Sequence, residues 1–222
     1  MMKNKKWLYV ACIFVLWILS SLLVESSQAA LCAFRNPDKN VYVLFPEATG
    51  YRSVVVKLDK KAQEKTEKYL GHKLDFDEVG EHTFYLILKD KDVIGMIRPH
   101  AERGRYGIVE MVWAFTLDGK IKDYKIQRSR ERGTDKVKRV EFRRQFRGKS
   151  LKTAFTEANS KKINSKLFKV PKKSERICSV IAFSAKKNLF LYKHFFPEYN
   201  RNAEEHTNEK PQPNPEKESQ EK

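Results

Sequence analysis

The chain has 222 residues, 41% of them apolar, so it can bury the core of one domain of ordinary size. Its formal net charge of +17 excludes an acidic surface and favours anionic partners such as phosphates, lipid headgroups, acidic proteins or nucleic acid. The first 30 and the last 22 residues contribute little to this charge, so the positive field belongs to the middle of the chain. A basic surface that serves only solubility is the alternative.

Residues 1–30 have the pattern of a secretory signal peptide or an uncleaved signal anchor. Three lysines precede an uncharged apolar run at residues 7–24, and Ser27-Gln28-Ala29 offers small residues at the right spacing for cleavage after Ala29. The lysines favour a cytoplasmic N-terminus, so we expect the chain after the apolar run to lie outside the cytoplasm, in the periplasm or at the cell surface. Cleavage would release the domain and retention would leave it attached to the membrane by a transmembrane helix; both stay open.

Export also permits a disulfide. Cys12 lies in the apolar run, so Cys32 and Cys178, near the two ends of the predicted domain, are the candidates for a bridge. Two unpaired thiols, one of them buried as a small apolar side chain, are the alternative.

Residues 31–199 are predicted to form one α+β domain, a curved antiparallel sheet flanked by helices. Its predicted strands are at residues 50–58, 83–88, 93–97, 108–117 and 121–127. Asp118-Gly119 predicts a tight hairpin turn between the last two, because Gly accepts positive φ at no steric cost. The polar residues 98–105 are predicted to link two strands.

Helices are predicted before and after these strands. Asp59 is a plausible N-cap for residues 60–70, with Gly71 as the stop. Later in the chain, residues 136–146 predict a short helix that ends at Gly148, and residues 151–158 carry apolar side chains at helical spacing. Ser174 is expected to cap a last, mostly buried helix from residue 175 to about 195. Residues 200–222 lack apolar anchors and predict a disordered tail.

Motifs for common enzymatic chemistry are missing from the sequence. It contains no dinucleotide-binding glycine pattern, no P-loop, no paired-histidine zinc motif and no serine with a credible triad. His82 and His100 flank predicted strands, which favours surface or edge histidines over catalytic bases. We therefore assign no catalytic residue and no metal site, and expect any chemistry to belong to a cofactor. Whether the protein is an enzyme stays open; an electron-transfer or accessory role is favoured.

A basic cluster follows the hairpin. Residues 125–152 hold twelve basic and three acidic side chains. Arg128 and Arg130 alternate along a strand end and so project to the same side, and guanidinium groups suit phosphate because two donors meet two oxygens. Export and the lack of a recognition motif argue against nucleic acid, whereas anionic lipid is credible for a membrane-tethered domain. The alternative is one solvated helix face.

Several pieces together resemble the FMN-binding domain of the Rnf complex G subunit and of the sodium-translocating NADH:quinone reductase C subunit. They are the signal anchor, a strand containing Gly107, the DGKI hairpin at residues 118–121, the loop with Glu131 and Gly133, and QFRGK at residues 145–149. The resemblance covers about residues 80–195. It implies an exported, often membrane-anchored carrier of single electrons, and only the acid and the glycine match the family's Glu-Thr-Pro-Gly loop.

The resemblance fails at the residue to which the family esterifies FMN. That residue is a Thr in a Ser-Gly-Ala-Thr-x-Thr-Ser run at the start of the last helix. In this sequence Ile181, which has no hydroxyl, stands at the corresponding position. Flavin, if bound, is therefore expected to be held without a covalent bond. The implied contacts are Arg128, Arg130 and Arg132 to phosphate, Glu131 and Gly133 shaping the loop over the isoalloxazine, and Ser179 donating to phosphate.

The first reading is thus an extracytoplasmic, membrane-associated FMN-binding domain that serves electron transfer. The second is a cofactor-free interaction module of the same fold, which docks an acidic redox partner or an anionic membrane through its basic face. A third is an exported polyanion-binding protein unrelated to flavin.

Overall fold

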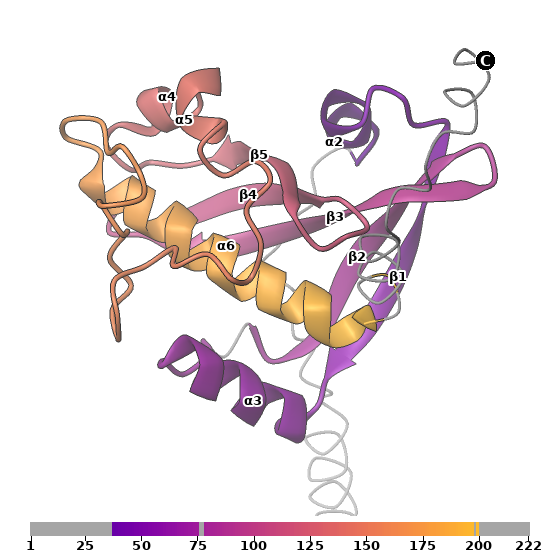
Figure 1. Cartoon of the computed structure of the whole chain (residues 1–222), viewed down its shortest axis with the longest axis horizontal. Coiled ribbons are helices and arrows are strands. Elements are labelled where there is room, and N and C mark those ends of the chain that lie inside the picture. The colour runs from indigo at the N-terminus through magenta and orange to yellow at the C-terminus, as the bar shows by residue number, and fades with distance from the viewer. Residues whose placement is uncertain (1–36, 76–77, 198, 200–222) are drawn as a thin grey trace, which may run out of the picture. The chain divides into compact units, whose positions relative to one another are not determined.

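Five strands form one antiparallel sheet in the order β1-β2-β3-β4-β5, so each strand pairs with its neighbour in the chain (Figure 1). The computed structural model describes residues 37–75, 78–197 and 199; the predicted signal segment and tail lie outside them. The predicted α+β class with an antiparallel sheet is confirmed. The strands are β1 (Gly50–Leu58), β2 (Gly80–Lys89), β3 (Asp92–Arg103), β4 (Ile108–Phe115) and β5 (Ile121–Arg128).

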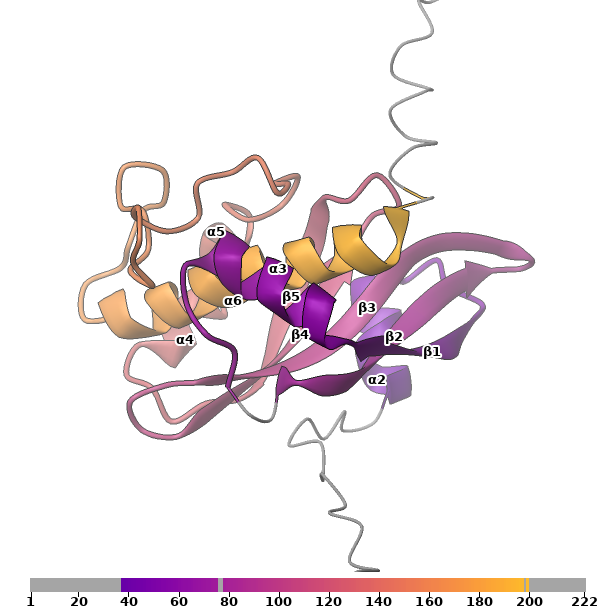
Figure 2. The same ribbon diagram turned by 90° about the horizontal axis from the view of Figure 1, so that it is seen from below.

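Helices cover both faces of this sheet (Figures 1 and 2). The long helix α6 crosses one face with α3 beside it, and the short helix α2 lies on the opposite face. No helix of the described part of the chain is long and apolar enough to cross a membrane. The helices are α2 (Pro37–Leu44), α3 (Lys60–Leu70), α4 (Thr134–Val137), α5 (Val140–Arg143) and α6 (Glu175–Phe195).

The two faces carry separate cores because successive strand residues point to opposite sides. On the α6 side, Phe84, Trp113 and Tyr192 belong to a large buried cluster. On the α2 side, Ile87 and Val112 pack with Val41 and Phe45 in a smaller one. Val41 and Leu44 of α2 and the following Phe45 are buried against this second face.

The elements with strong local signals are confirmed. Strand β1 and helix α3 have the predicted bounds, and α6 spans the predicted range. The Asp59 carboxylate accepts a hydrogen bond from Ala62 N at 2.7 Å, and Gly71 ends α3 at a φ of 73°. The predicted side-chain cap of α6 is wrong: Ser174 makes no capping hydrogen bond.

Three other local predictions are wrong. The predicted link at residues 98–105 instead extends β3 to Arg103. The predicted helix at residues 136–146 is divided into α4 and α5, because Arg139 between them has extended backbone. The predicted helix at residues 151–158 is irregular, and Phe155 is buried there with its ring stacked against Phe146 and Phe168.

Cys178 is a free thiol buried in the α6-side core. Burial raises the pKa of this thiol to about 12, so it has little thiolate character at neutral pH. Its proposed partner Cys32 lies outside the described residues.

Candidate functional site

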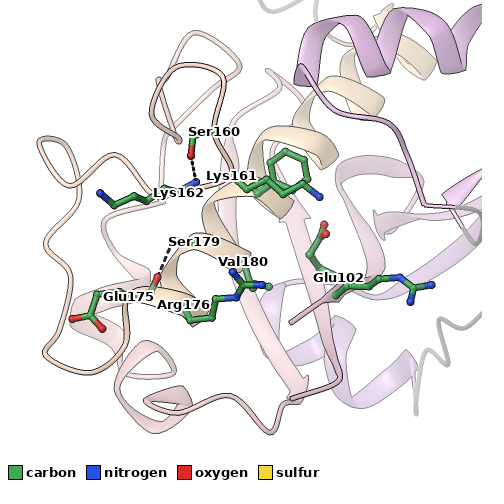
Figure 3. Close-up of a pocket in the computed structure, with 10 residues that line it drawn as sticks. Glu102, Ser160, Lys161, Lys162, Glu175, Arg176, Ser179 and Val180 are labelled. Carbon is green, nitrogen blue, oxygen red and sulfur yellow. Dashed lines mark hydrogen bonds between the residues drawn. The ribbon is translucent and has the colours of Figure 1, made fainter. Parts of the chain in front are cut away.

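A cavity of about 490 Å³ opens at the N-terminal end of α6 (Figure 3). This volume lies in the range of small-molecule sites, roughly 300–1,000 Å³. Three segments meet there: the end of β3, the loop around residue 161 and the first turns of α6. The lining residues are Glu102, Arg103, Ser160, Lys161, Lys162, Glu175, Arg176, Ser179, Val180 and Phe183.

Helix α6 presents one face to this cavity and buries another. Arg176, Ser179 and Phe183 recur at spacings of three and four residues, which places them along one side of the helix. Ile181, the residue at the family's flavinylated position, is fully buried in the core. It therefore offers neither a hydroxyl nor access to a ligand in this cavity.

The cavity has an apolar floor and a cationic rim. Val180 and Phe183 form the floor, and four basic side chains against two acidic ones line the rest. The Lys161 ammonium lies 4.6 Å from the centre of the Phe183 ring, in cation–π geometry. Such a site suits a ligand with an aromatic body and negative charge.

The predicted contact Ser179 lines this cavity, but its hydroxyl is already engaged. Ser179 Oγ donates to the Glu175 carbonyl at 2.8 Å and accepts from Ile163 N at 3.2 Å. Its present role is to hold the loop of residues 160–163 against α6. Donation to a phosphate would require the hydroxyl to release the Glu175 carbonyl.

Four of the other five predicted contacts lie in two neighbouring hollows, one of about 370 Å³ and one of about 200 Å³. The larger hollow holds Glu131 and Arg132 and shares Arg176 with the cavity. The smaller one holds Arg128 and Arg130 and shares Tyr106 with the larger. The predicted residues therefore follow one another around this end of the domain and do not converge on one point.

Two of these residues have structural partners. Arg128 pairs with the buried carboxylate of Glu110 at 2.7 Å, which turns it toward the sheet. Glu131 is buried and accepts a hydrogen bond from Tyr106 N at 2.7 Å, so it fastens the 129–133 loop to the β3–β4 turn. Arg130 and Arg132 are exposed.

Gly133 lies where this loop meets the start of α6. Its φ is +77°, and a Cβ there would collide with Ser174 Oγ and lie 2.8 Å from Ser174 Cβ. Only glycine has both the conformational freedom and the small size that this close approach requires.

We expect Gly133→Ala to destabilise the domain by about 1–3 kcal/mol more than Gly148→Ala, because overpacking adds to the backbone cost. Gly148 is a matched control: its φ is +73° and a Cβ there meets nothing within 4 Å. Urea unfolding of both variants measures the difference. Equal losses would show that the approach of Ser174 is not important for stability.

A buried polar network continues inward from the cavity, between β3 and α6. The Lys187 ammonium, 2% exposed, donates to Glu102 at 2.8 Å and also to Glu78. His100 Nε2 lies 3.2 Å from the same Glu102 oxygen. Atoms of Glu78, His100 and Glu102 that could ligate a metal lie within 4.8 Å of one another, but the Lys187 ammonium already donates to both carboxylates. We assign an ion-pair network here.

The interpretation of His82 and His100 as surface or edge histidines is wrong. Both are buried, and Arg98 bridges them with contacts to the two Nδ1 atoms at 2.8 and 3.4 Å. Burial, and secondarily the charge of Arg98, lowers the pKa of His82 to about 3 and the pKa of His100 well below 6.5. Both rings are therefore neutral at physiological pH.

Sequence reasoning missed most of the cavity residues, including Arg176, Lys161 and Phe183. Arg176 and Phe183 could have been found, because Ser179 lies in a predicted helix and these two residues are three and four positions away, on the same side of that helix. Lys161 could not have been found in this way, because its loop has no periodic pattern.

A scan against known protein families found no match to this chain, and a search of curated proteins found none either.

Proposed function

We propose that this domain binds a phosphorylated aromatic ligand non-covalently, with FMN as the best candidate, and serves electron transfer outside the cytoplasm. The observation that carries the proposal is the pairing of two adjoining spaces at one end of α6. One has an apolar floor and a volume of about 490 Å³; the other is cationic, with a volume of about 370 Å³. Arg176 lines both.

The chemistry of the residues fits a flavin mononucleotide. A planar ring system would lie in the cavity over Val180 and beside Phe183, displacing the Lys161 ammonium from the phenyl ring. The phosphate would occupy the cationic hollow, where guanidinium groups can offer paired donors. The basic residues of that hollow are Arg105, Arg132, Lys173 and Arg176.

Bound FMN would supply the electron-carrying chemistry, and the protein residues would bind and orient it. The resemblance to FMN-binding domains supports this choice of ligand. The predicted signal segment at residues 1–30 supports an extracytoplasmic, membrane-associated location and a redox protein partner with an acidic face.

The proposal is tested by titrating the purified domain with FMN and following flavin fluorescence. We expect binding by the wild type and roughly 10–100-fold weaker binding by Arg176→Ala, because a hydrogen bond to a charged group contributes about 1.5–3 kcal/mol. Arg52→Ala is the matched control, since Arg52 is an exposed arginine on the opposite edge strand β1. Unchanged fluorescence on addition of wild-type protein would refute the proposal.

A second candidate is a cofactor-free module that docks an acidic redox partner or anionic membrane. It is favoured by the exposure of Arg103, Arg130, Arg132 and Arg176 around this end of the domain. Such docking weakens as salt rises, because exposed charges are screened.

The variant Arg130→Ala separates the two candidates. It would weaken docking while leaving Arg105, Arg132, Lys173 and Arg176 to hold a phosphate. Arg128 is unsuitable for this test, because its removal would leave the buried Glu110 carboxylate without this ion pair. Salt-sensitive vesicle or partner binding without FMN binding would favour the second candidate.

A further inference from the structure

A second cavity, of about 550 Å³, lies between the segment of α4 and α5 and residues 169–171. Its volume is in the range of small-molecule sites. It shares no lining residue with the cavity at the N-terminal end of α6 or with the two hollows beside that cavity. A ligand bound here would therefore be a further one, separate from the proposed flavin.

The floor of this second cavity is apolar. Phe142, which is 3% exposed, lines it together with the partly exposed Val170 and Pro171. The Phe142 ring lies 5.6 Å from the Phe146 ring, and Phe146 in turn stacks on Phe168. Because this floor is part of the packed core, it offers a fixed surface on which a ligand can bury an apolar group.

Hydrogen bonds between side chains and backbone hold the two walls of the cavity together. The Gln145 amide donates to the Lys169 carbonyl at 3.2 Å and accepts from Lys169 N at 2.6 Å. The Lys136 ammonium donates to the Lys172 carbonyl at 2.8 Å. The walls are therefore in place before a ligand enters, which reduces the entropy that binding would cost.

The rim of the cavity carries an excess of positive charge. Lys136, Arg139 and Lys169 line it against one carboxylate, that of Glu141. Within the part of the chain that the structure describes, none of the three cations forms an ion pair, and the hydrogen bond of Lys136 goes to a neutral carbonyl. A negatively charged group at the rim would therefore meet cations that no carboxylate of the protein occupies.

We propose that this cavity is a second ligand site, which takes one molecule of an anionic amphiphile. An apolar chain or ring would lie on the floor, and a carboxylate or phosphate would lie at the cationic rim. A purely apolar ligand would leave the cations without a partner, and a small hydrophilic anion would leave the floor in contact with water. The combination therefore selects a ligand that has both parts. The inference does not depend on flavin binding.

Calorimetric titration of the purified protein with monomeric decanoate, decyl phosphate and decanol tests the class of ligand. We expect at least one of the two anions to bind with one molecule per chain, and decanol, the neutral analogue, to bind at least about tenfold more weakly. Decanoate stands for a fatty acid and decyl phosphate for a phospholipid, so their relative affinities distinguish these two sources. Acetate and inorganic phosphate, which lack the apolar chain, should also bind at least about tenfold more weakly.

Binding of neither anion would overturn the proposal, and so would equal binding of decanol or of the two small anions. Binding of the protein to vesicles of anionic phospholipid, without binding of either monomeric amphiphile, would also overturn it and would make this face a membrane-docking surface.

The double variant Arg139→Gln, Lys169→Gln locates the site. Both side chains are exposed, so neither is needed for the core. We expect about three- to thirtyfold weaker binding of the anionic amphiphile, as follows from the loss of two exposed ion pairs. Lys138→Gln, Arg144→Gln is the matched control: it makes the same change of net charge at two exposed positions of the same segment, and neither residue lines the cavity.

The control should keep the wild-type affinity. Wild-type affinity in the Arg139 and Lys169 variant, or an equal loss in the two double variants, would overturn the assignment of the ligand to this cavity. Thermal melting in the absence of ligand confirms that each variant is folded.

Discussion

Lys187→Met is expected to destabilise the domain by about 3–5 kcal/mol at neutral pH. The ammonium is 2% exposed and lies between the carboxylates of Glu78 and Glu102. Methionine keeps most of the side-chain volume but leaves two buried negative charges without this cation. An unpaired charge in the interior is far costlier than the lost attraction alone, because it was removed from water to reach that position.

Urea unfolding of Lys187→Met and Lys186→Met provides the measurement and its control. Lys186 is the adjacent lysine on α6, but it is only partly buried and its ammonium lies 3.4 Å from the Leu70 carbonyl. We expect its replacement to cost less than about 1 kcal/mol. Equal effects of the two substitutions would show that the ion network does not require Lys187.

Stability is expected to fall as pH drops from about 6.5 to about 4.5. An unfolded histidine titrates near pH 6.5, whereas burial lowers the pKa of His82 in the fold to about 3. Between these values the unfolded chain binds a proton that the folded domain does not, so acid favours unfolding. The full stability is present above pH 6.5, and the loss that His82 contributes reaches about 2–3 kcal/mol at pH 4.5.

His100 contributes in the same direction, since its pKa is also lowered, first by burial and then by Arg98. Chemical denaturation in steps of pH measures the slope. The variant His82→Gln removes one titrating group while its amide oxygen can still accept from Arg98, so the slope between pH 6.5 and 4.5 should be reduced. A wild-type stability that stays constant over this range would contradict the burial of neutral histidines.

Parts of the fold were predictable because their signals are local. The Asp59 cap and the Gly71 stop act within one helical turn of α3, and the hairpin of β4 and β5 depends on Asp118-Gly119 between two apolar or alternating runs. The apolar character of residues 175–195 likewise predicted a buried helix, and α6 is one. Each signal depends on residues that are only a few positions apart, so it can be read without knowing which distant segments come into contact.

The candidate site was less predictable because it depends on contacts between distant segments. The arginines after the hairpin were visible as a cluster, but the pairing of Arg128 with Glu110 across two strands was not. The cavity itself needs the loop at residues 160–162, which has no periodic pattern, and the face of α6 that carries Arg176.

The sequence by itself determined the antiparallel meander, the two well-bounded helices and the positive charge of the middle of the chain. Strand alternation and helix capping depend on residues that are close together along the chain, and charge follows from composition. Only the tertiary structure decided that the polar residues Arg98, His100 and Glu102 are interior. Polarity alone places such residues at the surface. They are buried because α6 brings Lys187 and Asn188, 85 and 90 residues away along the chain, within hydrogen-bonding distance. The free energy of a buried charge depends on the distance to its partner, and that distance is set by the fold.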